Sequence, residues 1–322
     1  GYIFLIPFFA IFIGFSAIPL FQTIYYSFFR YYKDLPKQVG PDFVGGANYA
    51  AVLGNPVFWK YAGNTVLLWI IGAVPQFIVA LVLAVWFTDE RLNLRMKKFF
   101  QVVVYMPNLV MAAAFGMLFL MLFSTNGPIS QIARALGIMS DTFQFINDTW
   151  WVRVIISFIN FLMWFGNTAL LLMSGIMGIE DQVFESARMD GAGGFRTFKD
   201  ITMPLLMPIF VYVLITSMIG GIQMFDAPQI FTQSRGGPQA TSYTVMMYLY
   251  SLISYSQNYG LAGALSVILF VFTCLISIFI FRTLTPSYNA LKSQRRALVK
   301  RLRWLRFNNK DYREAVSYGN QK

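Results

Sequence analysis

The chain has 322 residues, of which 57% are apolar and only 12% charged, whereas an ordinary soluble domain has about a quarter charged residues. Aromatic residues make up 18%, and a soluble chain of this length cannot build a core large enough to hide so much apolar surface. Intrinsic disorder is excluded as well, because low hydrophobicity is its signature. The composition therefore predicts an integral membrane protein.

Two counts of residue types exclude several kinds of chemistry. The sequence has no His and a single Cys, Cys274, which lies inside an apolar run. No intrachain disulfide, His/Cys metal site or His-based catalytic triad can form from these residues. We therefore predict no catalytic residues and no metal ligands.

Six uncharged stretches are each long enough to span a bilayer core of about 30 Å, which needs about 20 helical residues. Each is a continuous apolar block, which favours helices over alternating strands. The prediction is an all-α, polytopic protein with six transmembrane helices. In chain order the stretches are Tyr2–Phe29, Tyr61–Phe87, Phe99–Phe123, Val154–Ile179, Ile201–Phe225 and Tyr259–Phe281.

Proline and glycine mark the breaks in this pattern. Pro75 and Pro107 are expected to interrupt the second and third stretches. Segment 30–60 contains Gly40-Pro41 and further Gly and Pro residues, and it is predicted as turns and loop.

The distribution of Lys and Arg predicts the orientation. Segments 88–100, 178–204 and 282–322 contain 18 of the 25 basic residues, and the alternate connecting segments contain the other seven. The positive-inside rule places the basic set, and with it both termini, in the cytoplasm.

Residues 282–322 supply nine of the eleven net positive charges, which argues against a nucleic-acid partner. We divide the chain into a transmembrane domain, 1–285, and a basic cytoplasmic tail, 286–322. In the tail Leu291, Leu298, Leu302 and Leu305 recur at helical spacing between basic residues. This pattern is typical of an interfacial amphipathic helix on anionic lipid. A solvated tail that serves only as a topological signal is the alternative.

The connector 180–204, between the fourth and fifth stretches, contains an unusual motif. It reads Glu185-Ser186-Ala187-Arg188-Met189-Asp190-Gly191, then nine residues, then Ile201-Thr202-Met203-Pro204. The residues predict a short amphipathic helix, a break with positive φ in the glycine run from Gly191, a helix restart and a proline-initiated span. Such a helix, projecting from the membrane, would suit docking of a partner; a plain helix–turn–helix connector is the alternative.

The motif resembles the EAA loop of binding-protein-dependent ABC importers, with Ser186 and Met203 as the two departures. Further segments are similar to the sugar permeases related to maltose and glycerol-phosphate importers. These are Phe43–Tyr49 with Phe58-Trp59 and Asn64-Thr65, Gly236–Pro238 with Ala240-Thr241, and Tyr259–Leu265. Permeases for alginate oligosaccharides are one candidate within this subfamily, although no motif selects them.

The resemblance implies a type I ABC importer permease in a bacterial cytoplasmic (inner) membrane. Such a chain is half of a pore, paired with a second related permease in a heterodimer. The coupling segment binds a cytoplasmic ATPase dimer, which requires ATP and Mg²⁺, and an extracytoplasmic binding protein delivers a sugar or oligosaccharide, neutral or acidic. The chain has no G-x-x-x-x-G-K-[ST] sequence, so we expect it to bind no cofactor and to be no enzyme. The residues expected to couple it to the ATPase are Glu185, Ser186, Ala187, Asp190, Gly191, Ile201 and Pro204.

Candidate sugar-path residues lie in the fourth and fifth stretches. Asn160, Met163, Trp164 and Asn167 fall on one helical face, where amides can bond sugar hydroxyls and an indole can stack on a sugar ring. The resemblance implies that the helices flanking the coupling segment face the sugar. The fifth stretch would then add Ser217, Gly220, Gly221 and Met224. Helix packing through small and polar residues is the alternative for both sets.

A second class of function remains open at this stage. An ion-coupled secondary transporter would need acids within the spans, and Asp226 at a span end is the one residue that comes close.

Overall fold

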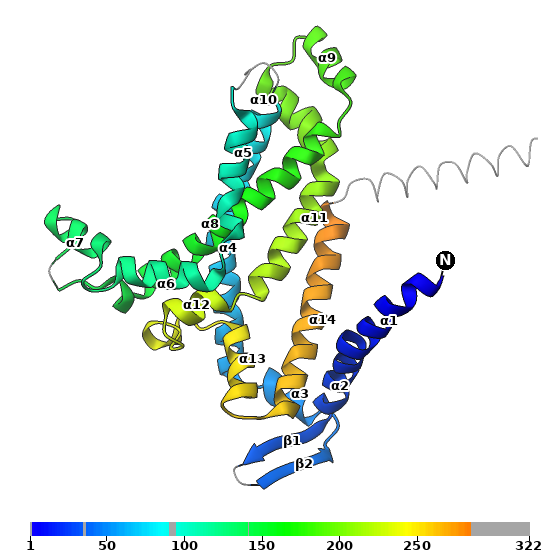
Figure 1. Ribbon diagram of the computed structural model, residues 1–322, viewed down its shortest axis with the longest axis vertical. Helices are drawn as coiled ribbons and strands as arrows, with labels where there is room; N and C mark the ends of the chain where they lie inside the picture. The colour runs from blue at the N-terminus through cyan, green and yellow to red at the C-terminus, as the bar shows by residue number, and fades with distance from the viewer. Residues whose placement is uncertain (1, 35–36, 90–94, 141, 285–322) are drawn as a thin grey trace, which may run out of the picture. The chain divides into compact units, whose positions relative to one another are not determined.

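The computed structural model describes residues 2–34, 37–89, 95–140 and 142–284 (Figure 1). Six apolar helical stretches in this part of the chain are long enough to cross a bilayer, which confirms the predicted number. They are Ile6–Ser27, Pro56–Thr88, Ala112–Ala135, Thr149–Met177, Gly194–Phe231 and Tyr259–Leu284. The predicted amphipathic tail, 286–322, lies outside the described residues. The chain divides into two compact units, Gly1–Leu275 and Ile276–Lys322, and the description below concerns the first.

The helices are divided by short irregular pieces. The N-terminal part comprises η1 (Tyr2–Leu5), α1 (Ile6–Phe12), η2 (Ile13–Ala17), α2 (Ile18–Ser27), β1 (Phe29–Asp34), β2 (Lys37–Phe43) and α3 (Ala47–Leu53). The middle comprises α4 (Pro56–Thr88), α5 (Lys97–Tyr105), η4 (Met106–Leu109), α6 (Ala112–Phe123), α7 (Pro128–Ala135), η5 (Phe145–Asn147) and α8 (Thr149–Met177). The remainder comprises α9 (Asp181–Met189), α10 (Gly194–Thr197), η6 (Phe198–Thr202), α11 (Met203–Ile222), α12 (Asp226–Phe231), η7 (Pro238–Ala240), α13 (Val245–Ser254) and α14 (Tyr259–Leu284).

Helices α4 and α8 form the central pair of the first unit, and polar contacts join them along their length. Ser157 Oγ donates to the carbonyl oxygen of Leu68 over 2.9 Å, and Gln76 Nε2 donates to Thr168 Oγ1 over 2.8 Å. Between these bonds a Cβ at Gly72 would lie 2.8 Å from the carbonyl oxygen of Ser157, so glycine permits the close approach. Small residues and interhelical hydrogen bonds are what hold helices together in a bilayer, where burial against lipid offers little driving force.

Two apolar clusters pack around this pair at its two ends. At the end where α9 lies, which we call the α9 end, Phe87 of α4, Leu172 of α8 and Leu206 of α11 are among the buried residues. At the opposite end, the hairpin end, Leu68 and Ile156 pack with Phe119 and Phe231. Figure 1 shows α9 and the β1–β2 hairpin at these opposite ends. Helices α4 and α8 therefore connect the two ends.

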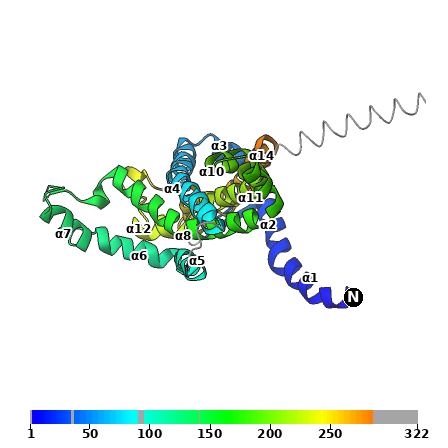
Figure 2. The same cartoon turned by 90° about the horizontal axis from the view of Figure 1, so that it is seen from above.

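The third predicted span, Phe99–Phe123, is not one helix. Helix α5 ends at Tyr105, η4 follows, and Met111 is extended (φ −63°, ψ 139°) before α6 begins. The break occurs because Pro107 has no amide N–H to continue the helix. Separately, Asn108 Nδ2 donates to the carbonyl oxygen of Met163 on α8 over 2.9 Å. Figures 1 and 2 agree that α6 and α7 then run outward from the α4–α8 pair. Pro75 lies inside α4, which continues through it from Pro56 to Thr88, so it does not divide the second span as Pro107 divides the third.

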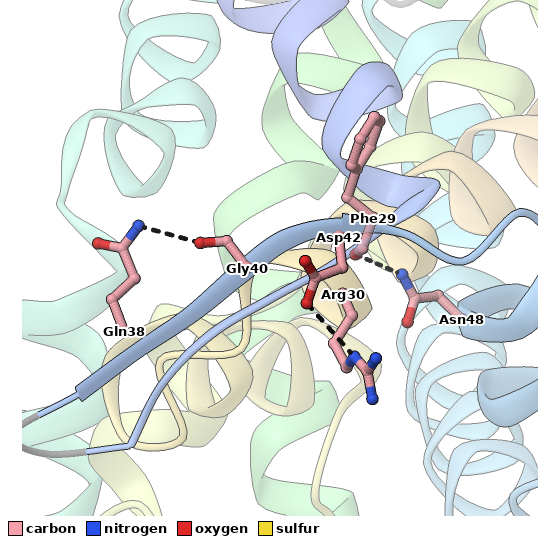
Figure 3. Close-up of polar contacts among 6 residues, drawn as sticks. All are labelled: Phe29, Arg30, Gln38, Gly40, Asp42 and Asn48. Carbon is pink, nitrogen blue, oxygen red and sulfur yellow. Dashed lines mark hydrogen bonds and ion pairs between the residues drawn. The ribbon is translucent and has the colours of Figure 1, made fainter.

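Segment 30–60 was predicted as turns and loop, and it instead contains an antiparallel hairpin followed by α3. Phe29 pairs with Phe43 and Tyr32 with Val39, with a register shift between Arg30 and Tyr32. Aromatic residues favour strands, and Pro41 is tolerated because both strands are edges. Figure 3 shows Arg30 beside Asp42 and Asn48 of α3 beside Phe29. Arg30 Nε lies 3.9 Å from Asp42 Oδ2, and Asn48 Nδ2 donates to the carbonyl oxygen of Phe29 over 2.9 Å.

Candidate coupling segment and translocation path

Helix α9 ends in a motif that its sequence dictates. Gly191 has φ +71°, the left-handed conformation that glycine adopts without strain. Its N–H donates to the carbonyl oxygen of Arg188 over 3.0 Å, and Ala192 N–H donates to that of Ala187 over 2.9 Å. These two bonds form a Schellman motif, with Asp190 as the C-cap. The predicted positive-φ break is confirmed at Gly191.

Only one face of α9 packs against the rest of the unit. Ala187 is buried, and Phe184 packs on the cluster of the α9 end that includes Phe87 and Ile176. Glu185 and Ser186 are exposed on the other face, where Ser186 Oγ donates to the carbonyl oxygen of Gln182 over 2.8 Å. Helix α9 thus packs against the unit through Phe184 and Ala187, and its opposite face, which includes Glu185, is exposed.

The segment that leads from α9 to α11 is also largely exposed at the surface. Arg196 and Asp200 form an exposed ion pair at 3.7 Å, Ile201 is half-buried, and Pro204 lies in the first turn of α11. Met189 is 88% exposed and Phe195 is 79% exposed, one on each side of the turn. Exposed apolar side chains on a short, fixed helix–turn unit are suited to insertion into a groove of a partner.

The four candidate path residues of α8 divide between two environments. Asn160 is buried toward α4, with its Nδ2 3.4 Å from the position that a Cβ on Gly72 would occupy. Met163 is half-buried, and its carbonyl oxygen accepts the bond from Asn108. Trp164 is 41% exposed and Asn167 is half-buried. On α8, therefore, Asn160 is covered by α4, whereas the side chains of Met163, Trp164 and Asn167 are only partly covered by the rest of the chain.

The candidate residues of the fifth predicted span, in α11 and just after it, also differ in their surroundings. Met224 is buried in the cluster at the hairpin end, and a Cβ on Gly221 would collide with the indole of Trp69. Trp69 Nε1 also donates to Ser217 Oγ over 3.3 Å. Gly220 has no neighbouring atom within 4 Å of its Cβ position. On α11, Gly220 therefore lies beside open space, whereas Gly221 serves close helix packing.

These adjacent glycines provide a matched test. We expect Gly221→Ala to lower thermal stability in detergent by about 1–3 kcal/mol, the usual cost of overpacking, because the added methyl meets Trp69. Gly220→Ala should leave stability unchanged or raise it, since alanine is the better helix former. Fluorescence-detected size exclusion after heating measures both variants. An equal loss of thermal stability in the two variants would contradict the close packing of Gly221 against Trp69.

Asp226, the one acid near a span end, is exposed in the first turn of α12. It is therefore not a buried ion ligand of the kind that a secondary transporter requires.

Comparison with known proteins is decisive at this point. Residues 49–288 match the family model of the binding-protein-dependent transport system inner membrane component. The chain belongs to this family. The matched region begins in α3 and contains the whole of α9 and its turn, together with the candidate path residues of α8 and α11. As a member of a transport permease family, the chain is a multi-pass membrane component of a transporter.

Named relatives of this permease transport carbohydrates. The lactose transport system permease protein LacF of Rhizobium radiobacter is 26% identical over 86% of this chain and 91% of its own. The arabinooligosaccharides transport system permease protein AraP of Halalkalibacterium halodurans is 28% identical over 86% and 85%. Among solved structures, a bacterial ABC transporter involved in the import of the acidic polysaccharide alginate has the same fold, with a TM-score of 0.68 and 20% identity over 87% of this chain and 93% of that one.

The permease contains one polar network that the sequence analysis did not assign. Residues 236–245, which we call the clasped loop, accept hydrogen bonds from Lys60 and Asn64 of α4 and from Arg153 of α8. Asn64-Thr65 belongs to a segment already recognised as similar to sugar permeases, and Arg153 is a charge next to an apolar run. These two features were visible in the sequence. The hydrogen-bonded residues, however, lie 88 to 179 positions apart in the chain, and no local pattern indicates which of them pair.

Proposed function

We propose that this permease is one half of the translocation pore of an ATP-driven importer of sugars or oligosaccharides, in a bacterial inner membrane. A second, related permease chain supplies the other half, and an extracytoplasmic binding protein delivers the sugar. A cytoplasmic ATPase dimer supplies the energy by hydrolysing Mg²⁺-ATP, and this chain itself binds no nucleotide. The α9 end is cytoplasmic, as are both termini, and the hairpin end is extracytoplasmic.

The observation that carries the proposal is the fixed turn after α9. Gly191, the capped end of α9 and the exposed Met189 and Phe195 form a rigid apolar projection at the position of the EAA motif. Glu185, Ser186, Ala187, Asp190, Ile201 and Pro204 shape this projection, and we assign them to ATPase coupling. The carbohydrate class is supported by the names of the relatives, which include transporters of neutral and acidic saccharides.

The sugar path follows from the accessible members of the two candidate sets. Trp164 and Asn167 offer an indole and an amide, and Gly220 adjoins open space, one turn from the half-buried Ser217. Saccharide rings stack on aromatic faces, and their hydroxyls bond amides and hydroxyl groups. The tail, 286–322, is proposed to bind anionic lipid at the inner leaflet.

The docking claim can be tested with a photo-crosslinking residue placed at Met189 in the assembled complex. We expect a crosslink to the ATPase subunit in membranes, and none from the same residue placed at Gln38, an exposed position of the hairpin. A crosslink from Gln38 and none from Met189 would contradict both the docking surface and the orientation.

A further inference from the structure

The clasped loop has an irregular backbone with little structure of its own. Gly236, Gly237, Gln239 and Ala240 all have positive φ, and the regular structure within the loop is the three-residue η7 and Val245, the first residue of α13. Its internal backbone bonds are short-range turns: Ser242 N–H donates to the carbonyl oxygen of Gly236 over 2.7 Å, and Thr241 N–H to that of Pro238 over 3.1 Å, among others. A loop of this kind needs external contacts to keep one conformation.

Helices α4 and α8 supply those contacts through four side chains. Lys60 Nζ donates to Gln239 O over 2.8 Å, and Asn64 Nδ2 donates to Ala240 O over 3.0 Å. Arg153 Nε donates to Thr241 O over 3.1 Å. Thr65 Oγ1 accepts from Val245 N–H over 2.9 Å at the far end of the loop. The loop is therefore fastened to the α4–α8 pair in its middle and at its α13 end. At its other end Gly236 N–H donates to Thr232 Oγ1 over 2.9 Å.

Arg153 is the centre of this network. Its Nη2 donates to Asn64 Oδ1 over 3.3 Å, so one guanidinium joins α8, α4 and the loop. Asn64 is buried and Arg153 is half-buried. No carboxylate in the described part of the chain forms an ion pair with Arg153; the two ion pairs there are Arg30–Asp42 and Arg196–Asp200. The guanidinium is thus used for directed bonds to a carbonyl and an amide, which its forked geometry suits.

Helix α8 links this network to the opposite end of the unit. It is uninterrupted from Thr149 to Met177, contains no proline and is capped by Asp148, so 29 residues extend about 40 Å. Only Gly178–Glu180 separate its last turn from α9. The Ser157–Leu68 and Gln76–Thr168 bonds keep α4 in register with it. When α9 is displaced, α8, α4 and the clasped loop bound to them are therefore expected to move with it.

We propose that Arg153 is a positioning residue for transport: together with Asn64 it fastens the clasped loop to the α4–α8 pair, so that the loop moves with α9 as one body. A movement that the ATPase imposes on α9 thereby changes the position of the clasped loop at the extracytoplasmic surface, where the binding protein docks. This inference rests on the proposed function and adds a route between its two docking surfaces.

The first test compares Arg153→Ala with Arg235→Ala in the reconstituted complex. Arg235 lies next to the clasped loop, is exposed, and forms no side-chain hydrogen bond to the described residues. We expect Arg153→Ala to lower the stimulation of ATPase activity by loaded binding protein about fivefold or more, the lower bound for a typical coupling energy. Basal activity and subunit assembly should be unchanged. Arg235→Ala should be stimulated like the wild type, and Arg153→Lys should recover part of the response.

Unchanged stimulation of assembled Arg153→Ala would overturn the proposal. Absence of stimulation in the wild type would instead contradict the proposed function, so the two failures are distinguishable.

If Arg153→Ala does not assemble, a second test uses an engineered disulfide in place of the hydrogen bonds between Asn64 and the clasped loop. Asn64→Cys and Ala240→Cys, combined with Cys274→Ser, place two thiols at neighbouring positions, since Asn64 Nδ2 donates to the backbone carbonyl oxygen of Ala240 over 3.0 Å. Reduced, this complex should respond weakly to the binding protein because the Asn64 bonds are lost; oxidised, it should regain stimulation. Loss of stimulation on oxidation, reversed by reductant, would show that the loop must leave the helices, and would overturn the proposal.

Discussion

Replacing Gly191 by Val is expected to abolish most substrate-stimulated ATPase activity and uptake, while the permease still folds and inserts. The left-handed conformation at φ +71° costs a residue with a Cβ about 1–2 kcal/mol, and β-branching adds to that cost. Relaxing this strain would undo the two Schellman bonds and turn Met189 and Phe195 away from their docking positions. A loss of 1–2 kcal/mol lowers the population of the docking conformation by a factor of about 5–30.

Gly193→Val is the matched control. Gly193 lies in the same exposed turn but has φ −69° and ψ 161°, which any residue adopts. Neither glycine has a neighbouring atom within 4 Å of its Cβ position, so contacts cannot account for a difference between the two variants. We expect Gly193→Val to retain activity, and Gly191→Asn to retain part of it, because asparagine tolerates the left-handed region. Equal activity of both valine variants would contradict the role of the turn.

Replacing Gly166 by Ala is expected to prevent recovery of a monodisperse complex from detergent. The added Cβ would collide with the carbonyl oxygen of Val104 and would lie 3.1 Å from Cα of Tyr105. Because both are backbone atoms, α5 and the break after it would have to move away from α8. Overpacking of this kind costs about 1–3 kcal/mol or more, and it would also disturb the Asn108–Met163 bond.

Gly175→Ala, in the same helix, controls for the change in helix propensity. A Cβ there would meet Leu206 Cδ1 at 2.5 Å and Ile209 Cδ1 at 2.8 Å, which are ends of side chains that can rotate away. We expect Gly175→Ala to lower the melting temperature only slightly. Size-exclusion profiles and thermal melts of the two variants measure the difference, and a Gly166→Ala variant as stable as Gly175→Ala would show that α5 does not pack closely at this point.

The membrane helices were predictable because a bilayer requires long apolar runs, and such runs are visible in the sequence without knowledge of the fold. The turn after α9 was equally accessible. Of the glycines 191, 193 and 194, however, only Gly191 has positive φ, a choice that depends on where α9 ends. The hairpin was not predicted, since the Gly and Pro residues of segment 30–60 hide strands that are mainly aromatic and polar.

The candidate path shows where periodicity stops being informative. Helical spacing correctly places Asn160 and Trp164 near each other along α8, yet Asn160 is buried toward α4 and Trp164 is partly exposed. Gly220 and Gly221 are likewise indistinguishable in the sequence, although one faces open space and the other contacts Trp69. Which neighbour covers a helix face depends on tertiary packing. The Arg153–Asn64 bond joins residues 89 positions apart, and a single sequence gives no signal for such a pair.

The central claim is that this permease passes a saccharide under the control of an ATPase. The most direct measurement is the ATPase activity of the complete complex in liposomes, with its binding protein, across a panel of neutral and acidic oligosaccharides. We expect one class to stimulate hydrolysis, together with uptake of the same saccharide, and no response when the binding protein is omitted. Hydrolysis that no saccharide alters, in a complex that contains the ATPase and the binding protein, would contradict the account.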